Sequence, residues 1–196
     1  MLELQRYIVK EQVAMLKVTD TYDIFDAESG KHLGVAKEVI GGFAAVMRWI
    51  IAKSMMPTRV EVRELPDQSL VFVMTRGWTF MRQRLEVRDA QNELIGYFVS
   101  KLFSIAGAFT VYTADDKLFA EVRGKNMLGF EYEFRTADQQ LLGNVDKKFE
   151  SVMKELFTSA DTYQVTISEE LREQPVAKML LLAAALAIDI VFKESN

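Results

Sequence analysis

The sequence predicts a mainly β fold: a closed antiparallel barrel of roughly ten or more strands around a buried hydrophobic C-terminal helix. Three observations lead to this prediction. Five segments repeat one strand–turn–strand pattern, the residues beside the turns alternate between apolar and charged types, and residues 175–192 are apolar on nearly every face. We expect residues 1–196 to form a single domain.

The repeated segments share a strand, a short turn that contains Asp, and a second strand that opens with Leu-x-Gly or a similar sequence. They are residues 24–34, 63–72, 87–96, 112–120 and 135–143. The turns of the last four follow one another at intervals of 24, 24 and 23 residues. Such a period accommodates two strands and two turns, so each repeat is predicted to be one hairpin.

Apolar and charged residues alternate beside these turns. Val60 and Val62 are separated by Glu61 and followed by Arg63, and the same period of two occurs at 85–88 and 130–135. This pattern is typical of antiparallel strands with one buried and one solvated face. Many such strands would leave unpaired edges, so closure into a barrel is the economical arrangement.

Residues 39–56 break the strand pattern and are predicted to be a helical or hydrophobic insertion between strands. The segment combines Phe43 and Trp49 with three methionines and with Arg48 and Lys53. This mixture suits contact with a membrane interface or a partner. A lid packed over the end of the barrel is the alternative.

The segment 175–192 must be buried in lipid or in protein, because a helix that is apolar on all faces avoids water. A lipid span needs about 20 apolar residues, whereas seventeen residues run from 176 to 192 and include Asp189. Strands that close around a helix rich in alanine explain the composition better, so we predict a central helix with Ser168 as its N-cap. We expect Asp189 to anchor the helix end by accepting hydrogen bonds. A tail anchor in a membrane is the alternative.

Composition excludes several classes of function. The net charge is −4, so no overall positive field attracts nucleic acid or anionic lipid, and a lipid contact needs a local basic patch. The chain has no cysteine and one histidine, His32, which we place in an exposed turn. There is no signal-peptide, phosphate-binding or nucleophile motif. We therefore predict a cytoplasmic protein that is not an enzyme and has no cofactor.

The sequence resembles the phospholipid scramblase and LURP-one-related proteins, whose fold is similar to the tubby C-terminal domain. The resemblance is carried by residues 6–13, 22–30, 84–98, 108–115, 143–167 and 177–192, the last including the Ile188–Asp189 pair. It implies a twelve-stranded antiparallel barrel around the C-terminal helix. For function it implies a range from lipid scrambling to roles that are not known.

Some features of the animal scramblases are missing. The chain lacks their Pro-rich extension and palmitoylated cysteines, Ser159 replaces the acidic residue that opens their proposed calcium segment, and Gln164 replaces a glycine. Asp161 and Glu170 remain, but a calcium site needs about six oxygen ligands. We expect no metal, and calcium in particular is not expected.

The leading hypothesis is a non-enzymatic barrel, peripheral at a membrane surface, that binds lipid headgroups or a protein partner. The alternative is a tail-anchored membrane protein with scramblase-like lipid translocation. The expected contact residues are Phe43, Arg48, Trp49, Lys53, Lys147, Lys148 and Lys154. Arg82, Arg84, Arg123 and Lys125 are further candidates for a basic patch.

Overall fold

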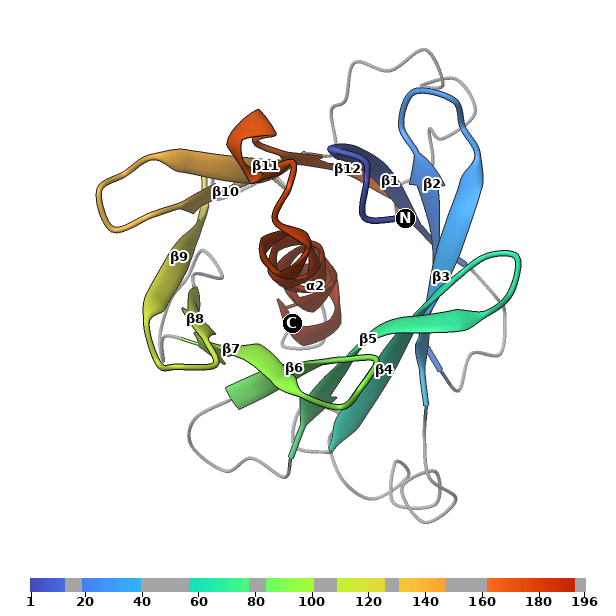
Figure 1. The fold of residues 1–196 in the computed structure, drawn as a ribbon, viewed down its shortest axis with the longest axis horizontal. Helices are drawn as coiled ribbons and strands as arrows, with labels where there is room; N and C mark the ends of the chain where they lie inside the picture. Colours follow the sequence, from blue (N-terminus) through green and yellow to red (C-terminus); the bar gives the residue numbers. More distant parts are fainter. Residues whose placement is uncertain are drawn as a thin grey trace.

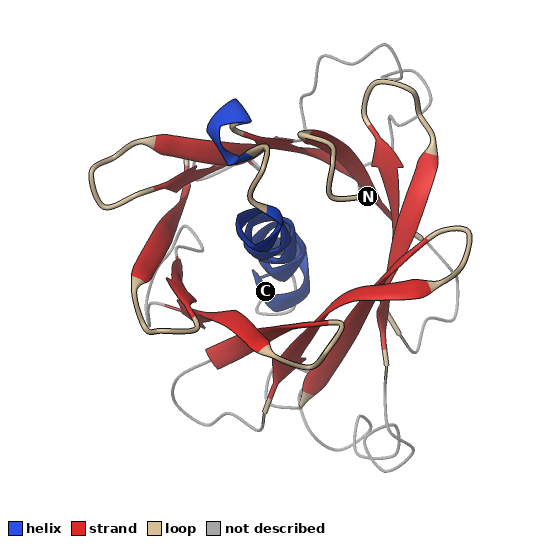
Figure 2. Cartoon of the chain, viewed as in Figure 1, coloured by secondary structure: helices blue, strands red, loops and turns tan. Residues whose placement is uncertain are grey.

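A closed antiparallel barrel surrounds one helix in the computed structural model (Figure 1). The structure describes residues 1–12, 19–39, 57–77, 84–100, 109–125, 131–146 and 162–192, except the side chains of Ser100 and of residues 189–192. Twelve strands and two helical segments lie in these residues. The fold predicted from the sequence is therefore confirmed, including the central position of the C-terminal helix (Figure 2).

The strands follow one another around the barrel in chain order, and β1 closes the ring by pairing with β12. Their bounds are β1 Arg6–Glu11, β2 Thr21–Asp26, β3 His32–Glu38, β4 Thr58–Glu64, β5 Ser69–Arg76, β6 Arg84–Asp89, β7 Leu94–Ser100, β8 Phe109–Thr113, β9 Leu118–Gly124, β10 Glu131–Arg135, β11 Leu141–Asp146 and β12 Thr162–Ile167. The short 3-10 helix η3 (Glu169–Leu171) and the helix α2 (Pro175–Phe192) complete the chain.

Antiparallel pairing gives the barrel two different ends. At one end, which we call the turn end, short turns join β2 to β3, β4 to β5, β6 to β7, β8 to β9 and β10 to β11. At the opposite end, which we call the far end, the odd-numbered strands finish, among them β3 at Glu38 and β11 at Asp146. Because α2 follows β12 and η3, it starts at the turn end and runs back through the barrel toward the far end.

The five repeats are the five hairpins of the turn end, as predicted. In each, the pairing register shifts next to the turn, which marks a β-bulge. The described residues with positive φ lie in these same turns, with angles from 61 to 69°: Gly30, Gln68, Asn92, Asp116 and Gln139. Asp89 shows how the turn is fixed, since its carboxylate accepts the backbone N–H groups of Gln91 (3.0 Å) and Glu93 (2.8 Å).

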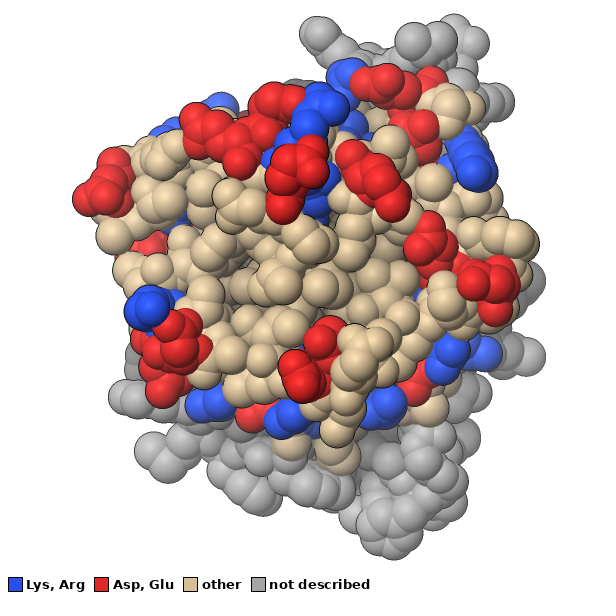
Figure 3. All heavy atoms as spheres, viewed as in Figure 1, with Lys and Arg blue, Asp and Glu red and all other residues tan. Residues whose placement is uncertain are grey.

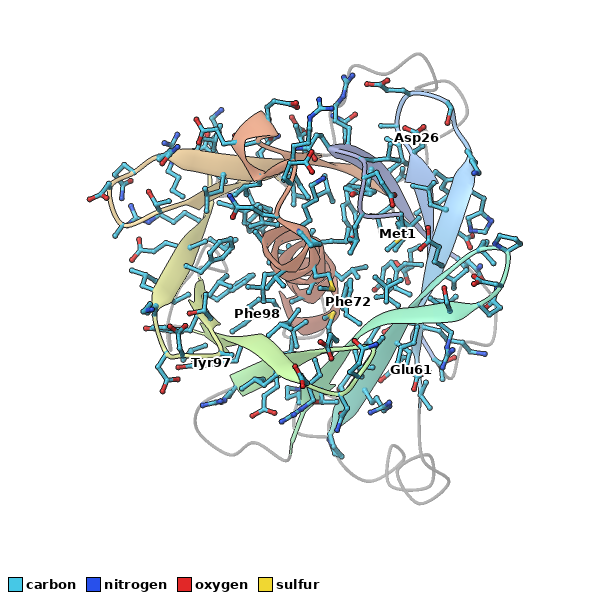
Figure 4. The ribbon with its side chains drawn as sticks, in the orientation of Figure 1. Met1, Asp26, Glu61, Phe72, Tyr97 and Phe98 are labelled. Carbon is cyan, nitrogen blue, oxygen red and sulfur yellow. The ribbon has the colours of Figure 1, made fainter. Side chains whose placement is uncertain are left out.

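The predicted alternation separates the two faces of the wall. Phe72 and Phe98 point inward toward α2, whereas Glu61 and Tyr97 lie on the outer face (Figure 4). The helix fills the interior, because residues 180–187 are at most 3% exposed. It packs closely against β7, β12 and η3. The burial predicted for this segment is thus provided by protein.

The prediction that Ser168 caps the central helix was wrong. Ser168 precedes η3 and its side chain makes no capping hydrogen bond, while α2 begins at Pro175. A backbone hydrogen bond closes this turn instead: the N–H of Leu171 donates to the carbonyl of Ser168 at 3.0 Å. The acidic residues that suggested a helix start belong to this single 3-10 turn.

Candidate functional site

The residues expected to contact a membrane or partner lie outside the described residues. Phe43, Arg48, Trp49 and Lys53 fall between β3 and β4, and Lys147, Lys148 and Lys154 fall between β11 and β12. The strand directions nevertheless relate the two segments. They leave the barrel from Glu38 and Asp146, two strand ends that lie at the same far end.

Asp189 lies in α2, but its side chain is outside the described part of the structure. Its role as an anchor of the helix end stays a prediction. The direction of α2 places this residue in the half of the helix nearer the far end.

A layer of buried polar side chains lines the inner wall near the far end. Arg76 is 2% exposed and its guanidinium Nη2 donates a hydrogen bond to the hydroxyl of Thr58 at 3.0 Å. Glu38 is 3% exposed, and its Oε2 accepts the backbone N–H of Asp20 at 3.3 Å. This layer was not predicted from the sequence, although the alternation of Phe72, Met74 and Arg76 places the arginine on the buried face.

On the outer wall, arginines are paired with glutamates two residues earlier in the same strand. Arg63 contacts Glu61 at 2.8 Å, and the equivalent distances are 3.0 Å for Arg88 to Glu86 and 2.8 Å for Arg135 to Glu133. These neighbours lower the pKa of Glu61 and Glu133, mainly because the arginines donate hydrogen bonds to the carboxylates.

The same three arginines also hold the turns. Each donates from Nη1 to the carbonyl of the turn residue with positive φ: Arg63 to Gln68 (2.9 Å), Arg88 to Asn92 (3.1 Å) and Arg135 to Gln139 (2.6 Å). The repeat therefore encodes an arginine that joins a strand carboxylate to the turn carbonyl. We call this arrangement the arginine clamp.

The other described basic candidates for a lipid patch also have acidic neighbours. Arg84 approaches Glu86 at 3.4 Å and lies 3.8 Å from the ring centre of Tyr97, Arg123 pairs with Glu121, and Lys125 approaches Glu133 at 3.8 Å. Because basic and acidic side chains lie next to one another, the outer wall carries alternating positive and negative charges. His32 is exposed, as predicted, but it opens β3 instead of lying in the turn, and its ring stacks on Phe25.

Charged side chains surround the turn end, while the middle of this face is uncharged (Figure 3). Residues 1–5 lie on this face beside the first turn of α2, between the helix and the wall near β1 (Figure 1). Lys178 in that turn is fully buried, and its Nζ donates to the carbonyl of Leu2 at 2.8 Å. No role was predicted for this lysine from the sequence.

Two absences in the described part of the chain are relevant to function. No group of three or more His, Asp and Glu side chains in this part of the chain is placed to hold a metal ion. Among the same residues, no helix has the length and apolar character needed to cross a membrane.

Comparison with known proteins extends the resemblance seen in the sequence. The family model described as Scramblase matches residues 68–195, which is more than half of the chain. This range runs from the turn before β5 to beyond the end of α2. No curated protein and no solved structure matches the chain.

Proposed function

The chain belongs to the scramblase family, and from this premise we propose that it is a non-enzymatic barrel protein that binds anionic lipid headgroups at a membrane surface through its far end. The observation that supports the proposal is that two sequence segments start from the same end of the barrel. Residues 40–56 supply aromatic and basic side chains, residues 147–161 supply lysines, and both leave the barrel from strand ends at the far end.

The two segments are complementary in chemistry. Trp49 and Phe43 are suited to the level of the headgroups, because aromatic side chains favour the boundary between water and hydrocarbon. Lys147, Lys148 and Lys154 supply positive charge, and each basic residue near an anionic surface contributes about 1 kcal/mol to binding. A net charge of −4 makes such a local concentration necessary.

The rest of the described molecule offers weaker candidates. On the outer wall, the arginine clamps and the paired residues Arg84, Arg123 and Lys125 have carboxylate neighbours, which reduces their pull on an anionic surface. Inside the barrel, α2 occupies the space that a small ligand would need. Both facts favour recognition by an end of the barrel.

Binding to protein-free vesicles tests the proposal. We expect the chain to sediment with vesicles that contain phosphatidylserine at low salt and to be released as salt screens the charges. Changing Lys147, Lys148 and Lys154 together to Gln should weaken binding about tenfold or more. The matched control changes Arg84, Arg123 and Lys125 to Gln, which removes the same charge from the wall and should leave binding nearly intact.

Equal losses in the two triple variants would show that only the overall charge matters and would contradict the assignment to the far end. Absence of binding at low salt would refute the lipid proposal. If the chain then bound native membranes but not vesicles made of the same lipids, the far end would recognise a membrane protein instead.

Lipid translocation is the second candidate, and family membership is the observation that favours it. In the form predicted from the sequence it requires α2 to leave the barrel and enter lipid. The buried position of α2 makes this costly, because residues 180–187 would give up their packing against the strands. Reconstitution with fluorescent lipids tests it: loss of inner-leaflet fluorescence to an external quencher would support translocation, and a fully protected inner leaflet would exclude it.

A further inference from the structure

Residues 1–5 lie inside the rim of the barrel at the turn end, on the side of β1 (Figure 1). Met1 is 5% exposed and lies inside the ring of strands (Figure 4), and Leu2 and Leu4 pack against the core. Two side chains reach these residues from below: Lys178 donates from Nζ to the carbonyl of Leu2, and Tyr7 donates from its hydroxyl to the carbonyl of Leu4, both at 2.8 Å. We call residues 1–4 the strap.

The strap is attached firmly at the side of β1. The carbonyl of Gln5 accepts the N–H of Ile167 at 2.8 Å, and the side-chain amide of Gln5 donates to the carbonyl of Ser168 at 2.8 Å. These bonds continue the pairing of β1 with β12 and fix where the strap begins. Lys178 holds the strap further on, beside the first turn of α2.

Two cavities border the strap near η3 and the start of α2. One of about 310 Å³ lies between the strap, the β2–β3 turn and η3, and another of about 380 Å³ lies between the strap and the start of α2. Both are lined by Glu3 and Arg172. Packing and charge also hold the strap: Met1 belongs to the core, its ammonium pairs with Glu64, and the hydroxyl of Tyr7 also donates to the carbonyl of Met1 at 3.3 Å. Lys178 is the side chain of α2 that holds the strap by a hydrogen bond.

Lys178 is an unusual residue for this position. Its side chain is fully buried, and among the described residues its ammonium, which has three N–H donors, has one acceptor, the carbonyl of Leu2. Burial of a charge with incomplete partners is costly, and an apolar side chain would fill the same space without that cost. Holding the strap is a property that an apolar side chain could not supply.

We propose that the strap opens and closes beside the first turn of α2 and that Lys178 is the latch that joins it to the helix. Opening breaks the bond to Leu2, brings the ammonium into water and joins the two bordering cavities into one groove at the turn end. The device lies at the opposite end of the barrel from the proposed lipid contact, so it does not depend on that proposal.

Thiol labelling tests the latch, because the chain has no cysteine. A Leu4→Cys reporter follows the strap, and an Ala120→Cys reporter, fully buried in β9, follows unfolding of the barrel. Lys178→Met should raise the labelling rate of the strap reporter about tenfold, as expected for loss of a hydrogen bond from a charged group. The rate at Ala120→Cys should stay the same or fall. An unchanged strap rate, or equal increases at both positions, would overturn the proposal.

A second measurement needs no change at Lys178. Acetylation of this buried amine in the natural sequence requires that it becomes exposed. If the strap opens locally, the rate is independent of low urea concentrations. Tyr7→Phe, which removes the hydrogen bonds of its hydroxyl to the carbonyls of Met1 and Leu4, then increases the rate several-fold. If acetylation follows global unfolding at every urea concentration, no separate opening exists and the proposal is wrong.

Discussion

Gly96 in β7 and Leu180 in α2 lie so close that position 96 has no room for a side chain. A Cβ atom there would be 2.8 Å from Cδ2 of Leu180 and 2.4 Å from the carbonyl oxygen of Tyr112 in β8. The leucine can turn away, but the carbonyl belongs to the neighbouring strand and cannot move without breaking the pairing. Gly96 therefore sets how closely the helix and the wall approach.

Gly96→Ala should lower the free energy of unfolding by about 1–3 kcal/mol, the usual cost of overpacking a core. Urea denaturation followed by circular dichroism measures it. Gly77→Ala is the matched control, because a Cβ at Gly77 has no atom within 4 Å and Gly77 has no positive φ. We expect this control to be neutral or slightly stabilising, and similar losses in both variants would mean that the contact with Tyr112 and Leu180 is not the cause.

The arginine clamps should stabilise the barrel more than ordinary surface ion pairs do. Arg88→Met keeps the aliphatic stem but removes the bonds to Glu86 and to the carbonyl of Asn92, so we expect a loss of about 1 kcal/mol. Arg172→Met removes an exposed pair with Glu169 that closes no hairpin, and it should have much less effect on stability. Thermal or urea unfolding of the two variants measures the two losses of stability. Equal losses would show that the contact of Arg88 with the turn does not stabilise the barrel.

Much of this fold could be predicted from the sequence, because each repeat is specified by residues that are close together in the chain. A turn that needs a residue at positive φ, a bulge beside it and an alternation of period two recur in five hairpins, and each signal lies within about ten residues of chain. Closure of the barrel then follows from the need to pair the edge strands. The prediction for 175–192 succeeded for a similar reason, since an all-apolar helix needs a wall on every side.

The parts that failed or were missed depend on contacts between distant residues. Lys178 binds the carbonyl of Leu2, which is 176 positions away in the chain, and the sequence around either residue gives no sign of this contact. Ser168 has the composition of a cap, but the chain turns through η3 before the helix starts. The contact residues at the far end were chosen for composition alone, and the strand order adds that their two segments leave from one end.

Burial of Lys178 should make stability depend on pH in the alkaline range. Desolvation lowers the pKa of this amine in the folded protein, and the nearby charges of Glu173 and Arg172 act in opposite directions. Below the folded pKa the cost of burying the charge is present in full. As pH rises from the folded pKa toward the ordinary value of a lysine, the folded protein loses its proton first and the cost disappears.

The natural chain should therefore gain stability relative to Lys178→Met as pH rises toward about 10.4, the value of a free lysine. Near neutral pH we expect the Met variant to be as stable as the natural chain or more stable, on the order of 1 kcal/mol. Urea unfolding of both proteins at pH 7 and pH 10 gives the difference directly. A difference that is the same at the two pH values would show that the ammonium is not desolvated in the folded state.

Thr58→Val tests the polar layer inside the far end. Valine keeps the shape of threonine but removes the hydroxyl that accepts a hydrogen bond from the buried guanidinium of Arg76. Loss of an acceptor for a buried charged donor should lower the free energy of unfolding by about 1–3 kcal/mol. Thr110→Val in β8, four strands from β4, removes a hydroxyl of similar burial and serves as the control. If Thr58→Val costs no more than this control, the threonine does not stabilise the arginine. A larger cost would mean that the far end, from which the proposed lipid contacts leave, is held by a polar network as well as by apolar packing.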